Sequence, residues 1–101
     1  MTINKEINGT ELRIAVEGRL DTMTAPELEA ELRESLDAAE SLILDFGKLE
    51  YISSAGLRTI LAAQQYLEEK DLPDVKVINI NAVVAEVFSV TGFDKLVDAE
   101  M

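Results

Sequence analysis

Two adjacent serines, Ser53 and Ser54, are the residues of this sequence best placed to do chemistry. Apolar residues after them recur at helical spacing, which predicts that a helix begins beside Ser54. The first turn of a helix has backbone N–H groups without intrahelical partners and lies at the positive end of the helix dipole. This position favours negative charge, so a phosphate on the Ser54 hydroxyl would be stabilised there.

Two interpretations of Ser54 follow from this position. In the first, Ser54 is only the N-cap of the helix and accepts a hydrogen bond from the amide of Gly56 or Leu57. In the second, Ser54 is phosphorylated and its phosphate meets the same donors without melting the helix. Gly56 costs about 1 kcal/mol relative to alanine inside a helix. We therefore expect a reason for it, such as close approach of another backbone at a docking surface.

The residues that are absent narrow the possible chemistry. The chain contains no cysteine and no histidine. This excludes, within the chain, a zinc site, a cysteine nucleophile, a Ser-His-Asp triad and a histidine phosphorelay. The acidic residues also lack the spacing of a calcium-binding loop. We therefore expect no metal, no cofactor and no enzymatic activity.

Length and charge limit the possible partners. A chain of 101 residues is long enough for one core, which predicts a single domain over residues 1–101. The net charge of −11, from 20 acidic and nine basic residues, argues against binding nucleic acid or an anionic membrane surface. No apolar run approaches the length of a membrane span, and no signal-peptide pattern is present. We expect no membrane insertion and a cytoplasmic location.

The elements that must position the serines alternate along the chain. Asn8-Gly9 predicts a hairpin turn between the first two strands, the second of which ends at Gly18. Thr24 and Glu27 have the spacing of a capping box at the start of a helix. The short apolar run 42–46, bounded by Gly47, predicts a buried strand and then a six-residue loop before the serine helix. The predicted strands are residues 3–7, 12–17, 42–46, 75–80 and 96–97. The predicted helices are residues 24–40, a helix that begins at residue 54, and residues 82–90. The last helix has Val83, Val84, Val87 and Phe88 on its apolar face and Gly92 as its C-cap.

This order predicts an α/β fold. A hairpin followed by alternating helices and strands implies a mixed, mostly parallel sheet of four to five strands, with an N-terminal hairpin, packed against α-helices. Loops that leave the carboxyl ends of parallel strands share one edge of such a sheet. Residues 19–23, residues 47–53 and Asn81 should therefore border one rim around Ser54.

Successive blocks of the sequence resemble a known family. They are GRLDTMTAP at residues 18–26, LILDF at 42–46, YISSAGL at 51–57 and FSVTGF at 88–93. They look like the motifs of the STAS domain, and more narrowly of a bacterial anti-sigma factor antagonist, over nearly the whole chain. The resemblance implies partner switching. An unphosphorylated antagonist binds an anti-sigma factor that is also a serine kinase and frees the sigma factor; phosphorylation by that kinase inactivates the antagonist, and a PP2C-type serine phosphatase resets it.

The resemblance also implies roles for single residues. The phosphorylated serine of the family lies two residues before the Gly-Leu pair, which is Ser54 here, and it commonly follows an aspartate, where this chain has Ser53. Arg58, four residues after Ser54, could partly neutralise the phosphate or could be a solvated cation near Tyr51. Asp21 could contact a basic patch on the partner or cap its own loop. The residues expected to contact the partner are Asp21, Thr22, Ser53, Gly56 and Arg58.

Three functions remain open at this point. The first is the phosphorylation-controlled antagonist, acting as a monomer. The second is a constitutive STAS interaction subunit of a transporter or lipid-transport complex, in which Ser54 is structural. The third is a small enzyme or nucleotide-binding sensor. The sequence has no glycine-rich phosphate loop and no His or Cys base to support this function.

Overall fold

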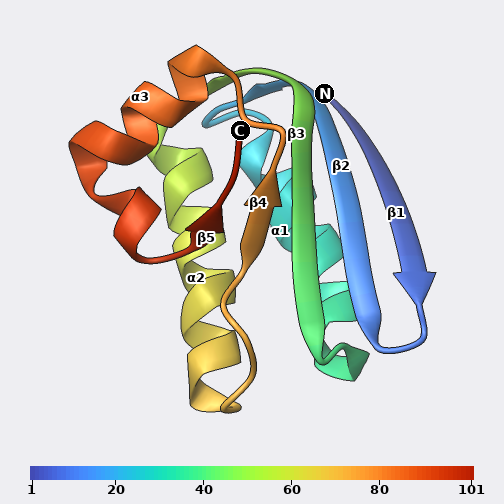
Figure 1. Ribbon diagram of the computed structural model, residues 1–101. Helices are drawn as coiled ribbons and strands as arrows, with labels where there is room; N and C mark the ends of the chain where they lie inside the picture. The colour runs from blue at the N-terminus through green and yellow to red at the C-terminus, as the bar shows by residue number, and fades with distance from the viewer.

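The computed structural model describes all 101 residues and contains one five-stranded sheet with helices packed against it (Figure 1). The strand order is β1-β2-β3-β4-β5; β1 and β2 are antiparallel, and the other neighbours are parallel. This confirms the predicted α/β fold with its N-terminal hairpin. The elements are β1 Thr2–Asn8, β2 Glu11–Leu20, α1 Ala25–Ser35, β3 Ser41–Ile52, α2 Ser54–Glu69, β4 Lys76–Ile78, α3 Ala82–Thr91 and β5 Asp98–Ala99, with 3₁₀ turns at Leu36–Ala38 and Phe93–Lys95.

The hairpin forms where Asn8-Gly9 predicts it, with Gly9 at a positive φ of 63°. The prediction that the second strand ends at Gly18 is wrong. Gly18 lies inside β2 at φ 97°, next to a shift in the register between β2 and β3, and the strand continues to Leu20. A bulge of this kind lets a strand bend without ending.

β3 is also longer than its apolar run suggests. It has 12 residues and ends at Ile52, so the predicted six-residue loop before the serine helix is wrong. A second register shift lies where Ala15 pairs with Asp45 and Glu17 pairs with Lys48. The Asp45 carboxylate supports this bulge by accepting hydrogen bonds from the Gly47 amide at 3.0 Å and the Asn79 side chain at 3.1 Å. As a result, a single residue separates β3 from α2.

The first helix begins at Ala25, one residue after the predicted start, and the capping box is wrong. Thr24 is the N-cap residue, and its hydroxyl makes no cap hydrogen bond to the helix. The hydroxyl instead donates to the carbonyl oxygen of Arg19 at 2.7 Å and accepts from the Asp21 amide at 2.9 Å. The helix was predicted to reach residue 40. It ends at Ser35 and is followed by one 3₁₀ turn.

The last third of the chain departs from prediction at three elements. β4 has only three residues, and β5 begins at Asp98 instead of residue 96. α3 buries Val84 and Phe88, whereas Val83, predicted on the same apolar face, is 55% exposed. Gly92 ends α3 in the left-handed conformation, at φ 77°, as predicted.

The core lies between the sheet and the helices. Alternate residues of β2 and β3 point towards α1 and α2, which lie side by side behind the sheet in Figure 1. Together with apolar residues of the helices they form one cluster of 25 buried side chains. None of the helices combines the length and the apolar character that crossing a membrane requires.

Candidate functional site

Ser53 is the N-cap of α2 and Ser54 is its first helical residue, so the interpretation of Ser54 as the N-cap is wrong. The Ser53 amide donates to the carbonyl oxygen of Leu20 at 2.9 Å, which continues the contact between β2 and β3 beyond the end of the strand. The Ser53 carbonyl accepts the first helical bond, from Leu57 at 3.0 Å. Strand and helix therefore both fix the backbone on which the serine pair lies.

The two serine hydroxyls have opposite environments. The Ser53 Oγ atom is buried and has no hydrogen-bond partner. Ser54, by contrast, is exposed on the first turn of α2. An enzyme that approached this end of the sheet would meet the Ser54 side chain, while the Ser53 oxygen lies beneath the surface.

Gly56 holds α2 close to the sheet. A Cβ atom at this position would lie 2.8 Å from Cγ of Leu20 and 2.9 Å from Cγ1 of Ile52, which are distances that real Cβ atoms essentially never show. Both of these side chains are at most 2% exposed. The glycine is therefore required by side chains of β2 and β3 within the protein. The expected reason, close approach of another backbone, is wrong.

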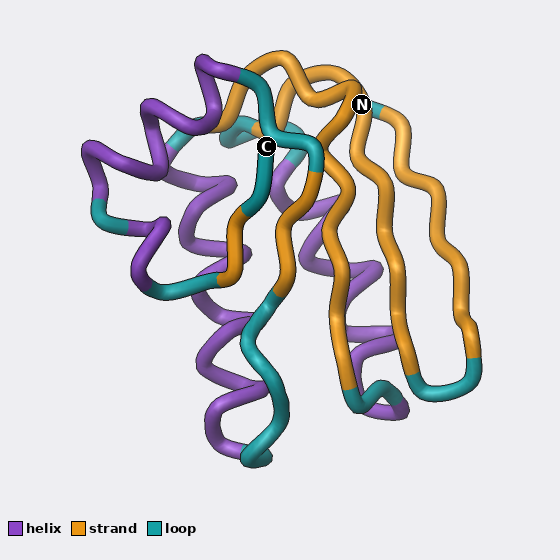
Figure 2. Tube along the Cα trace, viewed as in Figure 1, coloured by secondary structure: helices purple, strands orange, loops and turns teal.

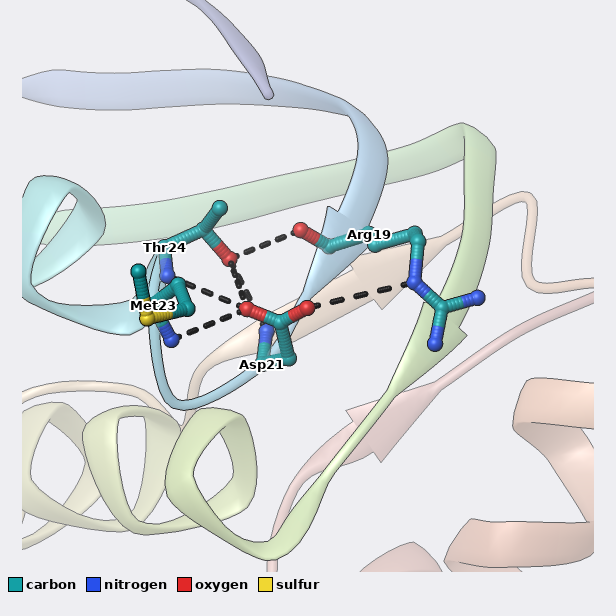
Figure 3. A network of polar contacts seen from close by, with 4 residues as sticks. All are labelled: Arg19, Asp21, Met23 and Thr24. Atoms are coloured by element: carbon teal, nitrogen blue, oxygen red, sulfur yellow. Dashed lines mark hydrogen bonds and ion pairs between the residues drawn. The ribbon is translucent and has the colours of Figure 1, made fainter.

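Asp21 organises the loop between β2 and α1 (Figure 3). Its carboxylate accepts hydrogen bonds from the amides of Met23 at 3.0 Å and Thr24 at 3.1 Å, and from the Thr24 hydroxyl at 3.2 Å. Partial burial tends to raise the pKa of Asp21, but these hydrogen bonds and the nearby Arg19 outweigh it and hold the pKa below its ordinary value. Of the two roles considered for Asp21, the structure shows the second: its side chain caps its own loop.

Arg58 and Arg19 differ in their partners. Arg58 is exposed and makes no ion pair within the protein. Its position one helical turn after Ser54 places both side chains on the same face of α2. Arg19, and not Arg58, is the cation beside Tyr51: its guanidinium carbon lies 4.4 Å from the ring centroid, and its Nε lies 3.9 Å from Asp21.

The loops converge on one rim, as the parallel strands predict. The ends of β2 and β3 and the start of α3 all lie at the upper end of the sheet in Figure 2. Two hydrogen bonds join these segments. The Ser53 amide donates to the carbonyl oxygen of Leu20, and the Asn81 side chain donates to the carbonyl oxygen of Leu49 at 2.8 Å. The Asn81 side chain also caps α3 by accepting from the Val84 amide at 2.9 Å. Asn81 is thus a positioning residue of the rim.

Two apolar side chains on the rim were not singled out from the sequence. Met23, at the tip of the Asp21 loop, is 85% exposed, and Tyr51, near the end of β3, is 36% exposed. Exposed apolar groups beside polar ones are typical of surfaces that bind proteins. Met23 could have been identified from the sequence, because it is an apolar residue inside a loop predicted to be polar.

A family model described as "Mlab, STAS domain" matches residues 3–98. The chain belongs to the STAS domain family. It is 37% identical to BtrV of Bordetella bronchiseptica, a candidate anti-sigma factor antagonist, over 79 residues, which is 77% of this chain and 67% of BtrV. This relative places the STAS domain in the anti-sigma factor antagonist type, as the sequence resemblance indicated.

Solved structures share this STAS fold. A candidate anti-sigma factor antagonist from Thermotoga maritima superposes with a TM-score of 0.89 at 16% identity, covering 98% of this chain and 86% of that one. The Bacillus cell fate determinant SpoIIAA in its phosphorylated form superposes with a TM-score of 0.77 at 19% identity, covering 99% and 89%. These similarities establish the fold around the rim.

Proposed function

We propose that this anti-sigma factor antagonist is switched by phosphorylation of Ser54. The unphosphorylated protein binds an anti-sigma factor serine kinase in the cytoplasm and thereby releases the sigma factor; the phosphorylated protein does not bind. The observation that carries the proposal is the exposure of Ser54 on the first turn of α2 while the neighbouring hydroxyl is buried. The existence of a phosphorylated form of SpoIIAA, which has the same fold, supports it.

The fold is compatible with the added charge. The amides of the first turn of α2 have no intrahelical acceptors, and the dipole of this 16-residue helix favours an anion at that end. Arg58, free of ion pairs and on the same face, supplies a second positive group. Phosphorylation therefore leaves the structure of the antagonist intact.

The phosphate on Ser54 weakens binding to the anti-sigma factor. A phosphate adds about −1.5 to −2 charges. In a fitted interface the resulting repulsion and desolvation cost several kcal/mol. A loss of about 3 to 4 kcal/mol corresponds to roughly 100-fold to 1,000-fold weaker binding, since each 1.4 kcal/mol is about tenfold.

The docking surface that we propose surrounds Ser54 and includes Thr22 and Arg58, both exposed. Asp21 contributes mainly by fixing the loop that presents Thr22. Ser53 and Gly56 contribute by fixing the backbone of the first helical turn against the sheet. The chemistry of phosphate transfer and removal belongs to the kinase and to a PP2C-type serine phosphatase, so this chain needs no catalytic residue.

Phosphorylation of the purified protein by its cognate anti-sigma factor kinase, with ATP, tests the proposal by mass spectrometry. We expect one phosphate, which is absent from Ser54→Ala and retained by the control variant Ser53→Ala. A phosphate that persists in Ser54→Ala would refute the assignment of the site.

A constitutive STAS interaction subunit is the second candidate. The family model that matches the chain is described as "Mlab, STAS domain". The resemblance seen in the sequence implies an aspartate before the phosphorylated serine, and this chain has Ser53 at that position. This alternative predicts a stable partner whose binding is the same for the wild type and Ser54→Asp. A pull-down that compares the two proteins separates the candidates, because the switch predicts that Ser54→Asp loses its partner.

A further inference from the structure

β1 forms a free edge of the sheet (Figure 1). Its seven residues, Thr2–Asn8, pair only with β2, whereas the strand at the opposite edge, β5, has two residues. The pairing with β2 has no register shift from Thr2 to Asn8, and β1 contains no proline. The backbone N–H and C=O groups on the outer side of such a strand are open to pairing with a further strand.

On the side of the helices, β1 presents Ile3, Lys5 and Ile7, which lie opposite core-facing residues of β2. Ile3 packs against the core, whereas Ile7 is 65% exposed and would be contacted by a strand outside β1. A lysine in an edge strand normally opposes such pairing. Here α1 neutralises Lys5, because its Nζ atom lies 3.1 Å from Glu31 and 3.8 Å from Glu34.

The other side of β1 and β2 is acidic. It carries Glu6, Glu11 and Glu17 with Arg13 as the one cation, because the residues that alternate with them in β2 face the core. Arg13 lies opposite Glu6 but pairs with Asp45 of β3 at 3.4 Å. Glu6 is therefore exposed and has no ion-pair partner within the protein.

The charged side chains of β1, together with those that contact it or lie opposite it in β2, are five acidic and two basic, a net charge of −3. The ion-pair partners one strand further in, Asp45 and Lys48, have opposite charges and cancel. Two copies of this chain paired edge to edge would bring these like charges together and would place Lys5 opposite Lys5 in the symmetric register. The charge of the edge therefore disfavours a second copy and favours a basic strand.

We infer that the outer edge of β1 is a docking surface that takes an extended segment of a partner protein as a sixth strand. This segment has apolar residues beside Ile3 and Ile7 and, at the alternate positions, lysine or arginine beside Glu6. Main-chain hydrogen bonds provide affinity, and the acidic edge selects basic over acidic segments. The surface contains neither Ser54 nor Thr22 or Arg58, so it does not depend on the proposed switch.

Fluorescein-labelled peptides of about nine residues test the inference by anisotropy titration with the full chain. The probe alternates valine and lysine, and a first control peptide carries glutamate in place of lysine. A second control keeps the number of lysines but has proline at two adjacent central positions, so that one of them removes a hydrogen bond to β1 in either orientation. We expect the probe to bind at least tenfold more tightly than either control. In its complex, hydrogen exchange should slow at alternate amides of β1, which are those that point away from β2.

Matched variants locate the binding. Glu6→Lys and Glu69→Lys make the same change of charge at exposed positions, and only Glu6 lies on β1. Glu6→Lys should weaken binding of the basic probe at least fivefold, whereas Glu69→Lys and Ser54→Asp should each alter it less than twofold; the result for Ser54→Asp separates this test from that of the switch.

Four results would overturn the inference: equal binding of the basic and acidic peptides, undiminished binding of the proline peptide, equal effects of the two lysine variants, and slowed exchange confined to other surfaces. Protection of the β1 amides that rises with protein concentration in the absence of peptide would show that a second copy takes the edge, which would also overturn it.

Discussion

Gly56→Ala gives a direct test of how the rim is held in place. Alanine is favoured over glycine inside a helix by about 1 kcal/mol, so propensity alone predicts a more stable protein. The new Cβ atom would lie 2.8 Å from Cγ of Leu20 and 2.9 Å from Cγ1 of Ile52. These are branch or mid-chain atoms of buried side chains and cannot swing away. Overpacking of this kind costs about 1 to 3 kcal/mol, and the tightness of both contacts indicates the upper part of that range.

The net expectation for Gly56→Ala is destabilisation by about 1 to 2 kcal/mol, after the gain in propensity is subtracted. Urea unfolding followed by circular dichroism measures it. In a Leu20→Ala background the closer obstacle is removed, so the same substitution should cost clearly less, which a double-mutant cycle detects. A Gly56→Ala protein that is more stable than the wild type would refute the packing argument and show that α2 can move away from the sheet.

Three further predictions concern buried or partly buried polar groups. Gln64→Leu should destabilise the protein by about 1 to 3 kcal/mol, because it leaves the buried Val75 amide without its acceptor at 2.7 Å; the exposed control Gln65→Leu should change stability little, and equal effects in urea unfolding would contradict this. Ser53→Ala should be neutral or stabilising, unlike the usual loss of a serine N-cap, since the Ser53 Oγ has no partner; a loss of about 1 kcal/mol would show that it caps in solution. Burial raises the pKa of Asp45, but hydrogen bonds from Gly47 and Asn79 and the nearby Arg13 keep the pKa below its ordinary value of 3.8. The ionised Asp45 carboxylate should therefore stabilise the protein fully above about pH 4, and this contribution should decline as the pH falls below that value. The difference in free energy of unfolding between wild type and Asp45→Asn should narrow on acidification. A difference that is constant from pH 7 to about pH 3 would contradict this prediction.

The order of helices and strands could be predicted because each of them is indicated by a short pattern of neighbouring residues. The Asn8-Gly9 turn, the helical spacing after Ser54 and the Gly92 C-cap depend on neighbours within a few residues. The convergence of loops at one rim followed from the parallel order of the strands. These features could be predicted without knowledge of any tertiary contact.

The errors have a common physical origin in contacts between distant residues. β3 extends past Gly47 because Asp45 holds a bulge with the help of Asn79, which lies on a later segment. The longer strand moves the N-cap from Ser54 to Ser53. The role of Gly56 depends on Leu20 in β2. None of these contacts produces a local sequence pattern.

The affinity of the protein for its cognate anti-sigma factor kinase, measured for three forms, tests the central claim most directly. Wild type, Ser54→Asn and Ser54→Asp differ at one exposed position, and asparagine matches aspartate in shape without its charge. Isothermal titration should give Ser54→Asn a Kd within a few-fold of wild type and Ser54→Asp a Kd weaker by about 100-fold or more. Equal affinity of wild type and Ser54→Asp, or equal loss in both variants, would contradict a switch that acts through negative charge at the start of α2.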